Sequence, residues 1–170
     1  MHAAQGIPQI DTEIAEKGHF WMETRKLAEV DQSLLQVKEY AGISVEEYES
    51  SWKTQRIIER TLQMMVETCV DVAGHIISDS GFRTPTSYSD TFKILYENGV
   101  LPAELFAKME KMAKFRNIIV HHYDSIDAEI VAGILKRDLD DFGVFQTTIV
   151  SLLEQEEDEK SPENPVDPTD

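Results

Sequence analysis

Cysteine is almost absent from this chain, because Cys69 is the only one among 170 residues. A single cysteine excludes a disulfide within the chain and a zinc site built from cysteines, so nothing points to an oxidising compartment. The N-terminus lacks the basic stretch and apolar run of a signal peptide, and no apolar run is long enough to span a membrane. We therefore expect a cytoplasmic protein that does not enter a membrane.

The motifs that hold cofactors and metals in many enzymes are also missing. No glycine-rich phosphate loop, dinucleotide fingerprint or His-Glu-x-x-His zinc helix occurs. His121 and His122 are neighbours, and on a helix neighbouring side chains point about 100° apart, so the two form a poor chelating pair. No serine or cysteine stands next to a histidine in the arrangement of a catalytic nucleophile. We expect neither a metal nor a cofactor.

Positive charge is scarce, since 16 Lys and Arg residues against 32 Asp and Glu residues give a net charge of −16. This balance argues against broad, unselective binding of nucleic acid. The basic residues are unevenly spread, however, and several of them cluster in one short segment. They are Lys108, Lys111, Lys114 and Arg116. Such a strip can still hold a phosphodiester, although lysines on a solvated helix face are the ordinary alternative.

Apolar residues recur at intervals of three and four, the period of an amphipathic helix, in five segments. The predicted helices cover residues 19–40, 51–80, 88–98, 102–122 and 127–155. Ser44 with Glu47, and separately Asp127, have the residue types and positions of helix N-caps. No internal repeat and no alternating strand pattern competes with these helices. We predict an all-α, antiparallel bundle of four to five helices in residues 19–155, with a flexible leader at residues 1–18 and a disordered acidic tail at residues 156–170.

One arginine lies on the apolar side of the fourth predicted helix. The apolar stripe of this helix consists of Leu105, Met109, Met112, Phe115 and Ile119. Arg116 projects into the stripe, and because an unpaired buried charge is costly, it must find a partner or line a cleft. Glu67, Asp71 and His75 follow one another at intervals of four on the second predicted helix and could supply the carboxylate. That edge could equally be a solvated face.

Arg116 and His121 together suit the cleavage of a phosphodiester without a metal. Histidine side chains exchange protons near neutral pH, and an arginine can bind two phosphate oxygens and stabilise the charge that builds on them. RNA brings its own nucleophile, the 2′-hydroxyl group. On a regular helix, five residues separate the two side chains by about 140°. Either the helix loosens near His121, or two copies of the chain form a shared cleft, and we favour the dimer.

The same two residues also have a purely structural interpretation. Arg116 would then form a buried ion pair, and His121 would interact with the C-terminal end of its helix. The spacing Arg-x-x-x-x-His occurs often by chance and does not decide between the two. If the ligand is RNA, the expected contacts on the same helix are Lys108, Lys111, Lys114 and Asn117.

The segment Phe-Arg-Asn-Ile-Ile-Val-His-His-Tyr-Asp-Ser-Ile-Asp (residues 115–127) resembles the signature of HEPN-domain proteins of the HepT type, the toxins of MntA–HepT (type VII) toxin–antitoxin systems. Further similar segments are Glu-Arg-Thr-Leu-Gln, Asp-Val-Ala-Gly-His-Ile-Ile, Pro-Thr-Ser-Tyr-Ser-Asp-Thr-Phe and Leu-Tyr-Glu-Asn-Gly-Val-Leu. The likeness extends in order from about residue 20 to residue 153.

The resemblance implies a dimer of helical bundles with a metal-independent ribonuclease site at its interface, acting on RNA, for which tRNA is one candidate. Arg116 and His121 match the catalytic pair of the family, and Asp71 stands about where a polar residue often faces the arginine. Tyr123 matches the tyrosine to which a partner nucleotidyltransferase, the MntA antitoxin, adds AMP and so silences the toxin. Each AMP would bring a negative phosphate into a cleft meant for RNA.

A non-catalytic interpretation stays open. A HEPN module could dimerise and bind a nucleotidyltransferase partner or a nucleotide without cutting RNA. The intact set of Arg116, His121 and Tyr123 favours the enzyme, because a binding module has no evident need for all three. The high negative charge favours the binding module.

Overall fold

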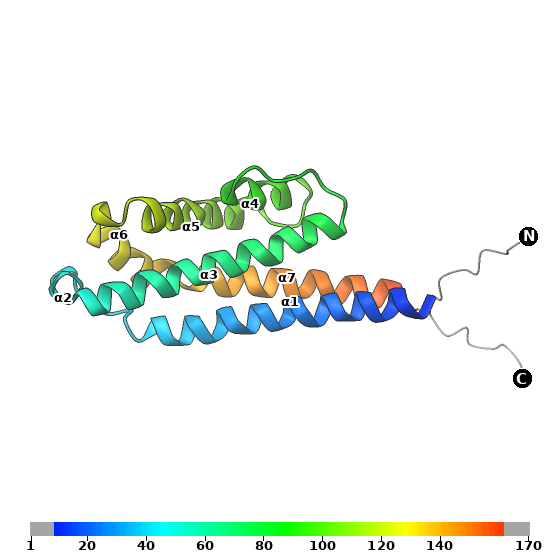
Figure 1. Ribbon diagram of the computed structural model, residues 1–170, viewed down its shortest axis with the longest axis horizontal. Coiled ribbons are helices and arrows are strands. Elements are labelled where there is room, and N and C mark those ends of the chain that lie inside the picture. The colour runs from blue at the N-terminus through cyan, green and yellow to red at the C-terminus, as the bar shows by residue number, and fades with distance from the viewer. Residues whose placement is uncertain (1–8, 162–170) are drawn as a thin grey trace, which may run out of the picture.

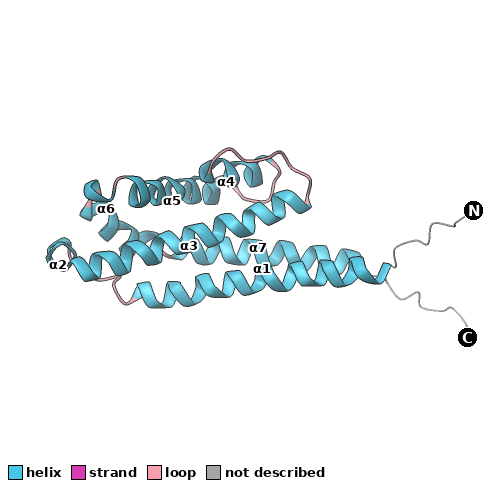
Figure 2. Ribbon diagram, in the orientation of Figure 1, coloured by secondary structure: helices cyan, strands magenta, loops and turns pink. Residues whose placement is uncertain are grey.

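Helices form all of the regular structure in the described part of the chain. The computed structural model describes residues 9–161, and no strand occurs in that range (Figure 2). The helices are α1 (Gln9–Lys38), α2 (Val45–Ser50), α3 (Trp52–Asp79), α4 (Tyr88–Glu97), α5 (Ala103–His121), α6 (Ala128–Gly133) and α7 (Asp140–Lys160), with a 3₁₀ turn at Tyr123–Ser125 and a π-helical segment at Ile134–Asp138. The predicted all-α class is confirmed. None of the described helices combines the length and apolar character needed to cross a lipid bilayer.

The long helices run side by side and alternate in direction (Figure 1). Helix α1 packs against α3 and α7, whereas α5 packs against α3, α4 and α7. Helices α2 and α6 meet at one end of the bundle, and α1 begins and α7 ends at the other (Figure 1). Helices α3 and α5 are thus in direct contact within the bundle.

Short polar side chains set where several helices begin. Ser44 accepts a hydrogen bond from the backbone N–H of Glu47 at 3.1 Å, and Asp127 accepts one from the N–H of Glu129 at 2.9 Å, so both predicted caps are confirmed. Ser87 caps α4 in the same way. At the other end of α3, Gly81 has a φ of +68°, a left-handed conformation in which glycine carries no steric penalty.

Three boundaries differ from the predicted ones. Helix α1 begins at Gln9, inside the expected leader, and α7 continues to Lys160, inside the expected acidic tail. Residues 1–8 and 162–170 lie outside the described residues. Helices α1 and α7 pack against each other elsewhere along their length, whereas residues 154–160 of α7 are exposed. The predicted helix at residues 127–155 is interrupted by the π-helical segment, a local change of register that apolar periodicity does not reveal.

The core is continuous through the bundle. The apolar stripe predicted for α3 is buried throughout, and its members are Ile58, Leu62, Met65, Cys69, Val72 and Ile76. Phe92 of α4 and Phe145 of α7 are fully buried and meet edge to face, with ring centroids 5.7 Å apart. Burial also raises the pKa of the Cys69 thiol, so this cysteine is an apolar packing residue rather than a nucleophile.

A buried polar contact joins α2 to α3. The Tyr48 hydroxyl donates to Glu59 Oε1 at 2.7 Å, and Arg56 Nη1 donates to the other carboxylate oxygen at 2.7 Å. Tyr48 and Glu59 are both buried. Burial, together with the hydrogen bond to Glu59, raises the pKa of Tyr48, which therefore stays a neutral donor to a buried carboxylate.

Replacement of Tyr48 by phenylalanine should lower the free energy of unfolding by about 1–3 kcal/mol, because the buried carboxylate of Glu59 loses a hydrogen bond. Urea unfolding followed by circular dichroism measures the change. Tyr96→Phe is the matched control, since Tyr96 is 43% exposed and its substitution should change the free energy by about 0.5 kcal/mol or less. Equal effects of the two substitutions would contradict a stabilising role for the buried contact.

Candidate functional site

Arg116 of α5 is held against α3 by one carboxylate. Its Nη2 and Nε atoms both donate to Oε1 of Glu67, at 2.7 and 3.0 Å. The Arg116 side chain is only 16% exposed. The expectation that an arginine on the apolar side of this helix needs a carboxylate partner is therefore confirmed. The Nη1 atom, at 3.5 Å from Asn117 Oδ1, is the part of the guanidinium that stays available for another ligand.

The partner is Glu67 and not Asp71, the residue that the family resemblance placed opposite the arginine. Asp71 instead lies 3.5 Å from Nζ of Lys26 in α1, and its side chain is 62% exposed. Glu67 and Asp71 are one helical turn apart on the same edge of α3, so the sequence pattern indicated both of them. Which turn meets Arg116 depends on how far α3 is shifted along α5, and that is a property of tertiary packing.

The Glu67 carboxylate is stabilised in its ionised form. Burial opposes ionisation, but hydrogen bonds from Gln63 and Arg116 and the positive charge of Arg116 outweigh it, so the pKa of Glu67 lies below the ordinary value of a carboxyl group. Gln63 Nε2 donates to Oε1 of Glu67 at 2.9 Å. The ion pair is therefore present at neutral pH and is lost only when the pH falls through the lowered pKa of Glu67.

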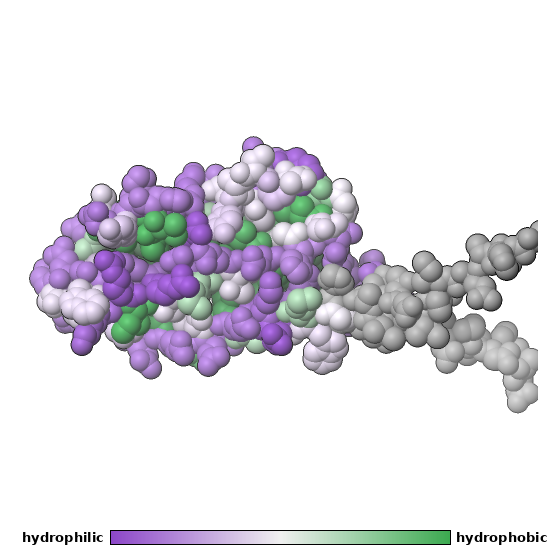
Figure 3. Space-filling model, viewed as in Figure 1, coloured by the Kyte–Doolittle hydropathy of each residue, from purple (hydrophilic) through white to green (hydrophobic). Residues whose placement is uncertain are grey.

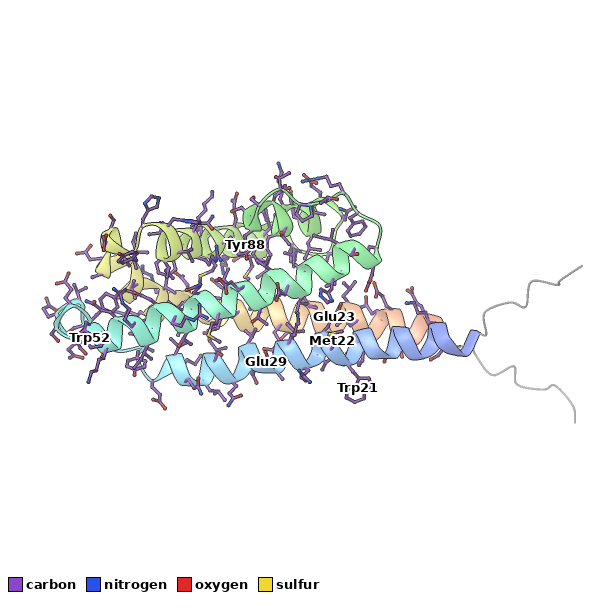
Figure 4. The ribbon with its side chains drawn as sticks, in the orientation of Figure 1. Trp21, Met22, Glu23, Glu29, Trp52 and Tyr88 are labelled. Carbon is purple, nitrogen blue, oxygen red and sulfur yellow. The ribbon has the colours of Figure 1, made fainter. Side chains whose placement is uncertain are left out.

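Tyr88 is a second neighbour of Arg116, and it was not among the predicted site residues. The guanidinium carbon of Arg116 lies 4.5 Å from the centroid of the Tyr88 ring, in a cation–π contact. Tyr88 is the first residue of α4, and Figure 4 shows it where α4 and α5 face α3. The only sequence signal was its place in the segment Pro-Thr-Ser-Tyr, one of those that carry the family resemblance.

His121 and Tyr123 lie at the C-terminal end of α5, and both are exposed. His121 is the last residue of the helix, which stays regular up to that point. Tyr123 is 57% exposed and begins the 3₁₀ turn, and the guanidinium carbon of Arg56 lies 5.7 Å from its ring centroid. Because α5 does not loosen before His121, the helix offers no local distortion that would turn the His121 side chain toward Arg116.

The expected RNA contacts on α5 are Lys108, Lys111, Lys114 and Asn117. Lys108 Nζ lies 3.3 Å from Asp141 of α7, and Lys114 forms an ion pair with an acid one turn earlier in α5. Asn117 contacts Arg116 directly. Each step of three residues turns a side chain by about 60° around a helix, so the basic strip is spread over several faces. Asn117 is thus closer to the Arg116 site than Lys108 is.

Comparison with known proteins gives consistent matches over most of the chain. The family model for HepT-like ribonucleases matches residues 30–149. The mRNA nuclease HepT of Shewanella oneidensis is 28% identical over 120 residues, which are 71% of this chain and 90% of that protein. The tRNA nuclease HepT of Aphanizomenon flos-aquae is 31% identical over 135 residues, which are 78% of this chain and 89% of that protein.

The fold also matches a solved toxin structure. The tri-AMPylated Shewanella oneidensis HEPN toxin in complex with MNT antitoxin has a TM-score of 0.70 and 26% identity, with 76% of this chain and 96% of that chain covered. The family match contains the whole segment from Arg116 to Tyr123 and about two thirds of the residues, so the resemblance found in the sequence is confirmed. The chain belongs to the family of HepT-like ribonucleases.

Proposed function

We propose that this protein is the toxin of a toxin–antitoxin system and that it cleaves RNA without a metal ion, with Arg116 and His121 as its catalytic residues. The observation that carries the proposal is the environment of Arg116. Glu67 and Tyr88 contact its guanidinium, and an exposed histidine, His121, follows it five residues later in the same helix. The relatives named above are nucleases of mRNA and of tRNA, so both kinds of RNA are candidate substrates.

The reaction needs few groups from the protein. The 2′-oxygen of the RNA attacks the adjacent phosphorus, and the bond to the 5′-oxygen of the next nucleotide breaks. The proton of the 2′-hydroxyl passes to His121, and the leaving 5′-oxygen takes a proton from water. Nε and Nη2 of Arg116 donate hydrogen bonds to Glu67, which leaves Nη1 to donate to a non-bridging phosphate oxygen. This contact stabilises the negative charge that builds up in the transition state. Glu67 is a positioning residue, because it acts through Arg116.

A dimer supplies the geometry that one chain lacks. Arg116 and His121 diverge by about 140° on a regular helix, and α5 is regular through His121, so the histidine that serves an arginine comes from the second copy. Helices α3 and α5 carry exposed apolar side chains that such a dimer would cover, namely Ile57, Met64 and Val120. Figure 3 shows apolar patches among the hydrophilic surface on the face in view.

Tyr123 is the proposed site at which a partner nucleotidyltransferase of the MntA type adds AMP. Its ring is more than half exposed, and the guanidinium of Arg56, which also pairs with Glu59, lies 5.7 Å from the ring centroid. The Shewanella oneidensis toxin described above is tri-AMPylated and bound to an MNT antitoxin, which supports the proposal. Added AMP groups would fill the cleft with bases and negative charge and so exclude RNA.

The second candidate function is a non-catalytic HEPN module that dimerises and binds a nucleotidyltransferase or a nucleotide. The net charge of −16 favours it, and so does the pairing of Lys108 with Asp141, because a paired lysine contributes less to phosphate binding. Cleavage of RNA by the purified protein decides between the two functions.

Arg116→Ala and His121→Ala should each abolish cleavage of a total tRNA and mRNA pool by unmodified protein in EDTA, while circular dichroism shows an intact helical fold. Cleavage products are separated on denaturing gels, and the intact mass of the protein is recorded first to exclude bound AMP. No cleavage by unmodified wild-type protein would favour the binding module, and unfolding of both variants would favour a structural role.

The same two variants test the shared cleft. When equal amounts of the two variants are unfolded and refolded together, about half of the dimers contain one chain of each variant. If each site takes Arg116 from one chain and His121 from the other, one of the two sites in such a mixed dimer is intact. The mixture should therefore regain about a quarter of the wild-type activity. If Arg116 and His121 of one chain form the site, no activity returns.

Glu67→Ala should lower kcat about 10-fold or more with a smaller change in KM, because Arg116 loses its orientation. Glu67→Gln should be intermediate, since an amide oxygen still accepts from the guanidinium. Because the pKa of Glu67 lies below the ordinary carboxyl range, its protonation does not shape the rate near neutral pH, and the pH profile of Glu67→Gln should keep the wild-type form. Asp140→Ala, which removes an exposed ion pair with Lys38, is the control. Full activity of Glu67→Ala would contradict the positioning role.

Tyr123→Phe should cleave RNA like wild-type protein but remain active after incubation with the cognate nucleotidyltransferase and ATP. Mass spectrometry of the intact protein should show AMP on the wild type and none on the variant. Tyr96→Phe, which changes another exposed tyrosine, should be modified and silenced like the wild type. Stoichiometric labelling of Tyr123→Phe would show that another residue is the acceptor.

A further inference from the structure

We propose that a surface groove between α3 and the start of α4 binds the nucleobase next to the phosphate held by Arg116. This inference rests on the proposed function and names a part of its substrate site. The groove, called the Tyr88 groove below, has a volume of about 440 Å³. Its lining includes Asp71, Gly74, His75, Thr86, Ser87 and Tyr88.

Tyr88 connects the groove to the Arg116 site. Arg116 packs on the ring of Tyr88 at 4.5 Å, and the same tyrosine lines the groove, whereas Arg116 does not. Tyr88 therefore borders both the guanidinium and the groove. Aromatic side chains are the usual platforms on which unpaired bases of RNA stack. A phosphate on Arg116 and a base on Tyr88 would be contiguous parts of one nucleotide chain.

The charge of the groove suits a base better than a phosphate. Among the described residues, the lining contains no lysine and no arginine, and it includes the carboxylate of Asp71, which is 62% exposed and pairs with Lys26 at 3.5 Å. The ion pair leaves no net positive charge for a phosphodiester, and the exposed carboxylate oxygens accept hydrogen bonds from the amino group of a base. The hydroxyl of Ser87 accepts the backbone N–H of Asp90 and can still donate its own proton to a base.

Gly74 keeps the groove open. It lies in the interior of α3, where glycine is less favourable than alanine. No atom lies within 4 Å of the position that its Cβ would occupy, so close packing of another element does not require a glycine there. A side chain at this position would instead project into the groove that Gly74 lines. Packing of the fold does not require this glycine, and its lack of a side chain leaves the groove accessible.

The wall that carries Tyr88 is held rigidly. Arg83 donates through Nη1 and Nη2 to the two oxygens of Asp90, both at 2.8 Å, and the backbone N–H of Thr86 donates to Asp90 at 2.9 Å. Arg83 also reaches Glu97 at the other end of α4. These bonds fix the segment between Arg83 and Tyr88, and a wall fixed before binding loses little entropy when a base enters.

The test measures binding separately from cleavage. In the full-length His121→Ala background, fluorescence anisotropy records the affinity for a labelled single-stranded oligoadenylate RNA. Gly74→Leu, which fills the groove, and Tyr88→Leu, which removes the ring, should each weaken binding about 10-fold or more, a loss typical of one stacked base. Tyr88→Phe keeps the ring and should bind within about twofold of the background protein.

Two controls isolate the base and the fold. Gly143→Leu alters another helix-interior glycine with open space at its Cβ position, in α7, and should leave binding unchanged. With an abasic RNA of the same length, Gly74→Leu and the background protein should bind equally, because no base is present to enter the groove. Circular dichroism verifies that each variant is folded.

The outcomes separate this inference from the proposed function. If wild-type protein cleaves RNA in EDTA but Gly74→Leu binds and cleaves like wild type, the groove assignment is wrong and the nuclease stands. If binding depends on Gly74 and Tyr88 while wild-type protein does not cleave, the base site stands and the nuclease does not. Absence of any RNA binding by the folded background protein overturns both. Equal weakening with abasic RNA would mean that the groove does not bind a base.

Discussion

The ion pair between Arg116 and Glu67 is the interaction on which the rest of the site depends. It joins α5 to α3, the two helices that also carry the exposed histidine and the open groove. A guanidinium that is 16% exposed needs such a partner, because desolvation of an unpaired charge is costly. The carboxylate neutralises Arg116 in the free protein and fixes its direction, and it leaves one nitrogen for a phosphate oxygen.

This arrangement explains how a strongly acidic protein can hold a polyanion. Broad electrostatic attraction is weak at a net charge of −16, and Lys108 is engaged with Asp141. In the proposed function, affinity comes from a few placed groups, namely Arg116 for a phosphate and Tyr88 for a base. Such a site would recognise a short segment of RNA rather than the whole polyanion. Addition of AMP at Tyr123 would act at the same place, since it blocks a small cleft rather than a wide basic surface.

The positions of the helices along the chain follow from local pattern, except at two helix ends. The apolar period of α3, the caps Ser44 and Asp127, and the isolated charge of Arg116 within an apolar stripe were all visible in the sequence. The early start of α1 and the late end of α7 were not, because both extensions are polar segments without the apolar period on which the predicted bounds depended.

The sequence by itself determined the helical class, the need of Arg116 for a carboxylate partner, and the family to which the chain belongs. These properties depend on residue type and on spacing within one helix, which a linear pattern records directly. Only the tertiary structure decided that Glu67 rather than Asp71 meets Arg116, and that Tyr88 closes the other side of the guanidinium. Both choices depend on how α3, α4 and α5 are shifted along one another, and packing of the whole core sets that shift.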